Sequence, residues 1–183
     1  AKRKNILYFR GSFEDQIARW YGALEKFGLE FFANIGADNP FFDPKLMDLS
    51  LQTLHEQPEI DVLEHPKDLN AATFTHAIRT KVLEKICQTK TTTETGVYFT
   101  FFEEPELGLK IRQLEVPYKT HFNNNIRITL DYPEDLDFFK KVFEELNIDI
   151  NNIPTKDIIE FLEANPEIVK INFFRNEQYK LNQ

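Results

Sequence analysis

The sequence predicts a three-layer α/β domain whose central sheet is mostly parallel, and two parts of the chain carry this prediction. Near the N-terminus, residues 5–9 and 29–35 are apolar strand candidates that flank an amphipathic helix over residues 12–27. A strand, a helix and a second strand in this order are typical of a parallel sheet. Later in the chain, residues 126–130 alternate between apolar and polar side chains and precede a helix over residues 133–146.

The first helix has clear signals at both ends. Ser12 can cap its N-terminus, and Gly28 suits its end. Glu14 and Asp15 place negative charge in its first turn, where the helix dipole favours it. Its apolar residues recur at helical spacing: Phe13, Ile17, Trp20, Tyr21, Leu24 and Phe27. We therefore expect this helix to bury an aromatic stripe against the sheet.

The middle of the chain contains shorter elements. Pro44 fits the first position of a helix, and Pro58 ends that helix. Residues 60–63 and residues 109–114 are strand candidates. Between them, residues 74–86 have apolar side chains at helical spacing, so we expect an amphipathic helix there.

Two further helices are expected near the C-terminus. Pro133 opens the first one, and the apolar residues of its stripe, which we expect to lie on the sheet, are Leu136, Phe139, Val142, Phe143 and Leu146. Thr155 can cap the second helix, which the Asn165-Pro166 pair stops.

Composition excludes several classes of protein. The 183 residues, 42% of them hydrophobic and 18 of them Phe, suit one globular domain over residues 1–183. The net charge of −8, without any Lys/Arg-rich run, argues against nucleic acid as the main partner. Cys87 is the one cysteine, which excludes an intramolecular disulfide and a cysteine-based zinc cluster. No apolar run is long enough to cross a membrane, so we expect a cytoplasmic protein without a membrane partner.

Two aspartates occupy equivalent places in the predicted sheet. Asp38 follows the strand candidate over residues 29–35, and Asp131 follows the one over residues 126–130. If these strands are neighbours, both carboxylates meet at one edge, where they could hold Mg²⁺ for nucleotidyl or phosphoryl transfer. The alternatives stay open: Asp38 could only shape a turn, and Asp131 could only start a helix.

At these two aspartates the sequence resembles the sugar-acid cytidylyltransferases. Residues 35–44, Ile-Gly-Ala-Asp-Asn-Pro-Phe-Phe-Asp-Pro, resemble the Gly-Asp-x-Pro-Leu-x-Asp-Pro segment of that family. Residues 127–136, Arg-Ile-Thr-Leu-Asp-Tyr-Pro-Glu-Asp-Leu, resemble its Arg-x-Thr-x-Asp-x-Pro-Glu-Asp-Leu segment. Among the acylneuraminate and KDO enzymes of this family, the spore-coat polysaccharide subfamily is the most similar. Its helix start is similar to residues 9–12 with Asp15 and Arg19, and its ending is similar to residues 157–166.

The resemblance implies a function and a set of site residues. The architecture would be the Rossmann-like fold of nucleotide-diphospho-sugar transferases. Asp38 and Asp131 would be catalytic and would bind Mg²⁺ beside the phosphates of CTP. A sugar-acid oxygen would attack the α-phosphorus and release pyrophosphate, giving a CMP-sugar for surface polysaccharide. Glu94 and Arg19 would lie on the sugar-acid side, although Arg19 could also be a solvated helix residue. A homodimer would be compatible with this family.

The sequence also departs from the family. It opens at what resembles the family's third strand, so we expect the glycine-rich phosphate loop that precedes this strand to be missing from these 183 residues. Residues 92–97 read Thr-Thr-Glu-Thr-Gly-Val where the subfamily has Arg-Glu-His-Val-Thr, and of this motif Glu94 remains.

Two other functions therefore stay open. The chain could be a non-catalytic relative that acts as a binding or scaffolding module. It could also be a metal-dependent glycosyltransferase, although the Asp-x-Asp spacing of Asp135 and Asp137 falls within an expected helix.

Overall fold

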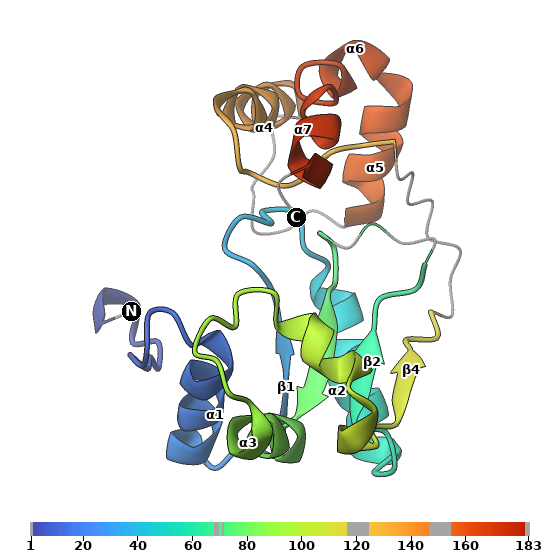
Figure 1. Ribbon diagram of the computed structural model, residues 1–183. Helices are drawn as coiled ribbons and strands as arrows, with labels where there is room; N and C mark the ends of the chain where they lie inside the picture. The colour runs from blue at the N-terminus through green and yellow to red at the C-terminus, as the bar shows by residue number, and fades with distance from the viewer. Residues whose placement is uncertain (1, 68–69, 71, 117–124, 147–154, 182–183) are drawn as a thin grey trace. The chain divides into compact units, whose positions relative to one another are not determined.

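The structure is a computed structural model that describes residues 2–67, 70, 72–116, 125–146 and 155–181 (Figure 1). The chain forms two compact units, each built from three segments. Unit 1 consists of Ala1–Ala33, Leu49–Glu64 and His76–Gln113. Unit 2 consists of Asn34–Asp48, His65–Thr75 and Leu114–Gln183. The expectation of a single domain stays a prediction.

A four-stranded mixed sheet has the strand order β1-β3-β2-β4. Its strands are β1 (Phe31–Asn34), β2 (Val62–Glu64), β3 (His76–Arg79) and β4 (Ile111–Gln113). Strand β2 pairs antiparallel with β3, with Val62 opposite Ile78, and parallel with β4, with Val62 opposite Ile111. The expectation of a mostly parallel sheet was therefore wrong, because an antiparallel strand lies inside the sheet.

That antiparallel strand also corrects the helix expected over residues 74–86. All four residues of β3 are buried, and the helix, α3 (Thr80–Thr89), begins only after the strand. Phe74, Ala77 and Ile78 are apolar residues at a spacing that fits a helix. This spacing alone could not exclude a buried strand. Pairing with β2 on one side and β1 on the other decides the outcome.

Residues 5–9 do not form the expected strand. They follow a short 3₁₀ helix, η1 (Lys2–Lys4), and have no ladder partner among the described residues. The segment instead packs through Phe9, whose ring lies so close to Gly22 of the first helix that a Cβ there would come within 2.9 Å. Residues 5–9 are thus held by side-chain packing on a helix and not by pairing in a sheet.

Residues 126–130 are likewise not a strand, and they belong to unit 2. Their main-chain groups bond to turns and side chains. Leu130 N donates to Asp38 O at 2.8 Å, and Asn70 Nδ2 donates to the carbonyl of residue 126 at 2.9 Å. Asn172 Nδ2 donates to the carbonyl of residue 127 at 3.1 Å. Ile126, Arg127 and Ile128 are all buried, so the alternating pattern marks neither a strand nor a single buried face.

The core of unit 1 lies around two helices. Helix α1 (Gln16–Phe27) packs against α3. Asp15, and not Ser12, caps α1, and Gly28 ends it in the left-handed conformation at φ 65°. Two 3₁₀ helices, η2 (Tyr98–Glu103) and η3 (Pro105–Leu107), follow α3 and contribute Tyr98, Phe102 and Leu107 to the core.

Helix α2 (Pro44–Glu56) begins at Pro44, as expected. Among the described residues of unit 2, the helices that follow are α4 (Pro133–Leu146), α5 (Thr155–Ala164), α6 (Pro166–Val169) and α7 (Arg175–Leu181). Helix α4 has the predicted bounds. Within unit 2 it packs against α6 and against Phe41, whose ring centroid is 4.9 Å from that of Phe139. No helix among the described residues is long and apolar enough to cross a membrane.

Candidate active site

Asp38 lies in a tight turn just beyond the end of β1. Asn39 N donates to Gly36 O at 3.2 Å, and the Asp38 side chain is exposed. The Asp38 carboxylate folds back over Gly36, because a Cβ on Gly36 would come within 2.0 Å of Asp38 Oδ1. Glycine at this position therefore provides the space for the carboxylate.

Asp131 lies at the junction between the segment of residues 126–130 and α4. Its Oδ2 accepts hydrogen bonds from Arg127 Nη2 at 2.7 Å and from Thr129 Oγ1 at 3.1 Å. Its side chain is 27% exposed, and its Oδ1 accepts no hydrogen bond from any residue that the structure describes. Two hydrogen bonds thus hold Oδ2 of Asp131 in place.

Both aspartates belong to unit 2, and the main chain brings them together. Leu130, directly before Asp131, donates its N–H to the carbonyl of Asp38. One hydrogen bond between a turn and an extended segment thus joins the main chain at the two aspartates, which do not lie at the ends of two parallel strands. Within the described ranges, no group of three or more His, Cys, Asp or Glu side chains could hold a metal. Shared binding of a cation by these two carboxylates stays a prediction.

A buried network of charged and polar side chains contacts Asp131. The Arg127 guanidinium is almost fully buried; its Nε donates to Asp135 Oδ1 at 2.8 Å and its Nη2 to Asp135 Oδ2 at 2.9 Å. Asp135 also accepts from the main-chain N–H groups of Asp131 and Tyr132, both at 2.9 Å, and Asn172 Nδ2 donates to it at 2.9 Å. Arg127 therefore contacts the exposed and the buried carboxylate at once.

This network shifts the pKa values of its members. Burial alone would raise the pKa of Asp135, but hydrogen bonds from Arg127 and from two main-chain N–H groups outweigh it and lower the pKa. Burial likewise opposes the charge of Arg127, and its contacts with Asp135 and Asp131 raise the pKa above the ordinary value. Both groups therefore stay ionised. Arg127 and Asp135 lie within the sequence motif of residues 127–136, but Asn172 carried no signal in the sequence.

Next to this network, Arg175 binds Glu134 through two hydrogen bonds, from Nε at 3.0 Å and from Nη2 at 2.6 Å. The guanidinium carbons of Arg127 and Arg175 lie 5.3 Å and 5.0 Å from the centroid of the Tyr132 ring. The segment around Asp131 is thus fixed by aromatic and ionic contacts as well as by hydrogen bonds.

The two residues expected on the sugar-acid side lie in unit 1. Glu94 is exposed in the loop after α3, and its N–H donates to Thr92 Oγ1 at 3.0 Å. Arg19, on α1, is half-buried and donates through Nη1 to the carbonyls of Ser12 and of Phe13, the latter at 3.0 Å. Arg19 is thus bonded to the turn before its own helix, which differs from a freely solvated side chain.

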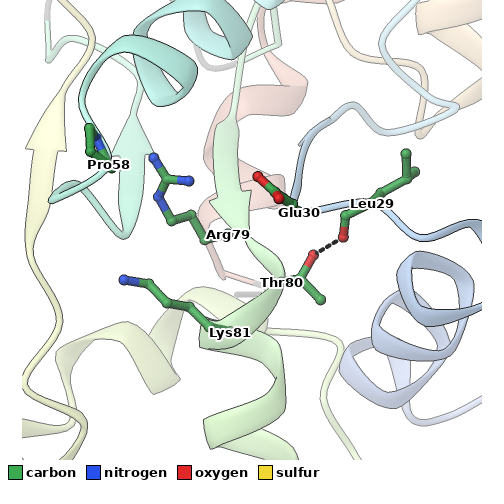
Figure 2. Close-up of a pocket in the computed structure, with 6 residues that line it drawn as sticks. All are labelled: Leu29, Glu30, Pro58, Arg79, Thr80 and Lys81. Carbon is green, nitrogen blue, oxygen red and sulfur yellow. Dashed lines mark hydrogen bonds between the residues drawn. The ribbon is translucent and has the colours of Figure 1, made fainter.

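A separate cavity of about 380 Å³ opens at the start of β1, whereas Asp38 follows the end of that strand (Figure 2). Arg79 lines it and donates to the carbonyls of Leu54, of Gln57 at 3.2 Å and of Ile60 at 2.7 Å. Arg79 therefore satisfies carbonyl groups at and beyond the end of α2. The other lining residues are Leu29, Glu30, Pro58, Thr80 and Lys81, and none of the expected site residues is among them.

Comparison with known proteins shows which family and which fold this chain matches. The family model described as cytidylyltransferase matches residues 2–158. An uncharacterized protein from Methanocaldococcus jannaschii is 26% identical over 166 residues, which cover 90% of this chain and 66% of that protein. This chain thus spans just under two thirds of the archaeal relative.

The structure of a cytidylyltransferase from Leptospira borgpetersenii serovar Hardjo-bovis has a similar fold. The TM-score is 0.77 at 22% sequence identity, and the match covers 92% of this chain and 70% of that chain. The fold is therefore shared along nearly the whole length described above. Because the family model matches most of the residues, this chain belongs to the cytidylyltransferase family.

Proposed function

We propose that this protein transfers CMP from CTP to a sugar acid in a Mg²⁺-dependent reaction that serves surface polysaccharide synthesis. The observation that carries the proposal is the hydrogen bond from Leu130 N to Asp38 O, which joins the main chain of the two motif segments. Membership of the cytidylyltransferase family supports the nucleotide. The similarity of the segments at both ends of the chain to the spore-coat polysaccharide subfamily supports the sugar acid.

Asp38 and Asp131 would hold the metal. Both carboxylates are exposed, and Oδ1 of Asp131 accepts no hydrogen bond from the residues described. Oxygen donors of this kind fit Mg²⁺, which takes one or two protein carboxylates together with water and phosphate oxygens. When bound, the ion would neutralise phosphate charge.

The other residues act on geometry and charge. Arg127 and Thr129 hold Asp131 Oδ2, so the carboxylate of Asp131 keeps one orientation. Gly36 leaves room for the Asp38 carboxylate. Glu94 and Arg19 would bind the sugar acid, whose hydroxyl oxygen forms a bond to the α-phosphorus of CTP while the bond to pyrophosphate breaks.

The test is pyrophosphate release by the full-length protein with CTP, MgCl₂ and either N-acetylneuraminate or KDO. Asp131→Asn and Asp38→Asn keep the size of the side chain and remove its charge, so each should abolish transfer. Tm should change little in Asp38→Asn and should fall in Asp131→Asn, which loses an ion pair with the buried Arg127. The double variant should be no worse than either single one, because residues that act as a unit are not additive. Asp137→Asn, an exposed position on α4, is the matched control.

Two results would contradict the proposal. Full activity in Asp131→Asn would reduce Asp131 to a residue that starts a helix. An absence of any Mg²⁺-dependent transfer or CTP binding by the natural protein would favour a non-catalytic member of the family.

A further inference from the structure

In unit 1, the side chains of Lys90 and Thr95 meet the carboxylate of Asp15, which is distant in sequence, and we call these three residues the Asp15 clasp. Lys90 Nζ forms an ion pair with Asp15 Oδ2, and Thr95 Oγ1 donates to Asp15 Oδ1 at 3.1 Å. Less than a tenth of each of these three side chains is exposed. Lys90 and Thr95 thus attach both ends of one loop to a single carboxylate.

The loop between these two anchors is polar and exposed. Residues 91–94 and Gly96 are all exposed, and Thr95 is the buried residue among them. Inside the loop, Lys90 Nζ donates to Thr92 O at 3.0 Å, and Glu94 N donates to Thr92 Oγ1 at 3.0 Å. Ordering such a segment costs conformational entropy. The buried polar contacts of Lys90 and Thr95 offset this cost, because residues 91–94 and Gly96 are exposed and bury no apolar side chain.

The same carboxylate also fixes the start of α1. Asp15 Oδ1 accepts from Ala18 N at 3.0 Å, and Thr95 Oγ1 accepts from Ile17 N at 3.0 Å. Arg19 follows one turn later and bonds back to the turn before the helix. The segment that carries Glu94 and the segment that carries Arg19 are therefore joined through Asp15.

Stability alone is a weak reason for this arrangement. A buried ion pair gains little over apolar packing, because removing both charges from water offsets much of their attraction. What a buried pair can provide is one defined conformation. In this molecule, that conformation belongs to a loop whose exposed acid is Glu94.

We infer that the Asp15 clasp positions Glu94 and Arg19 for the sugar acid, so that Asp15, Lys90 and Thr95 are positioning residues that do not themselves touch substrate. This inference rests on the function proposed above. It predicts that a change in the Asp15 clasp weakens binding of the sugar acid and leaves binding of CTP unchanged.

The test uses Thr95→Val, which keeps the shape of the side chain and removes both hydrogen bonds of its hydroxyl. Thr95→Ser restores the hydroxyl, and Thr93→Val is a matched control at an exposed position of the same loop. The KM for N-acetylneuraminate or KDO and the KM for CTP are measured in the full-length protein. We expect Thr95→Val to raise the sugar-acid KM by about tenfold or more. The CTP KM of Thr95→Val should stay within about twofold of the wild type. Both KM values of Thr95→Ser and of Thr93→Val should also stay within about twofold of the wild type.

Lys90→Met is the second variant and answers the question if Thr95→Val does not fold. Hydrogen exchange of residues 91–97 should become faster in each active clasp variant. Faster exchange with an unchanged sugar-acid KM would overturn the inference, and so would equal increases in both KM values. A wild-type protein without transfer activity would overturn the proposed function itself, whereas an active wild type with unaffected variants would overturn only the clasp.

Discussion

Gly36 is the residue on which the orientation of Asp38 depends. Gly36→Ala should move the Asp38 carboxylate, because the new Cβ would lie 2.0 Å from Oδ1. The φ angle of Gly36 is not positive, so Tm should change little while transfer activity falls by about tenfold or more. Gly96→Ala is the control, since a Cβ there meets no atom within 4 Å. Activity equal to wild type would show that the Asp38 side chain can reorient freely.

Asp135 is the buried partner of Arg127, and its loss leaves a buried guanidinium with less compensation. Asp135→Asn should lower the free energy of unfolding by roughly 3–5 kcal/mol. Urea unfolding measures this change. Asp137→Asn on the same helix, where the side chain is 68% exposed, should change the free energy by less than about 0.5 kcal/mol. Similar values for the two variants would mean that the network contributes little to stability.

At the scale of elements, α4 has an aromatic stripe whose centre is Phe139. This side chain is 3% exposed and contacts the rings of Phe41, Phe138 and Phe143. Phe139→Ala should therefore cost roughly 3–5 kcal/mol of unfolding free energy in a denaturant titration. Phe13→Ala is the control, because that ring is 95% exposed and should cost almost nothing. A loss below about 1 kcal/mol at Phe139 would show that the surrounding rings fill the cavity.

The bounds of helix α4 were predictable, because Pro133 and an amphipathic pattern are local signals, but the stripe differs from the prediction: Leu136 is 46% exposed, and Phe138 is buried. Strand β3 was not predictable, because the spacing of Ala77 and Ile78 fits a helix or a strand, and the choice depends on neighbours far along the chain. The alternation in residues 126–130 indicated a strand incorrectly, since residues 126, 127 and 128 are all buried. Propensity and periodicity do not specify hydrogen-bond partners.

The candidate site shows the same division. The sequence motifs identified Asp38 and Asp131, and the structure places their main chains side by side. The roles of Asn172 and of Lys90 could not be inferred, because each acts through a contact with a residue many positions away. Such tertiary contacts between single polar groups leave no periodic trace in a sequence.

For the whole molecule, the lowered pKa values of three buried aspartates predict a loss of stability in acid. The pKa values of Asp15, Asp61 and Asp135 are lowered: burial would raise each, but hydrogen bonds and cationic partners such as Lys90 and Arg127 outweigh it. Groups with a lowered folded pKa stabilise the protein fully above the ordinary carboxyl pKa of about 3.9. They lose this contribution as the pH falls from that value through the lowered pKa of the folded state. The free energy of unfolding should therefore drop between about pH 5 and pH 3. A value that stays level to about pH 3 would contradict this, and Asp135→Asn should flatten the curve.

The division into two units, each made of three segments, has a consequence for synthesis of the protein. The chain crosses from one unit to the other after residues 33, 48, 64, 75 and 113. Residues 34–48 are translated before residues 114–183, which make up most of the unit to which they belong. Unit 2 therefore cannot finish folding until this third segment has been translated, whereas all three segments of unit 1 precede it.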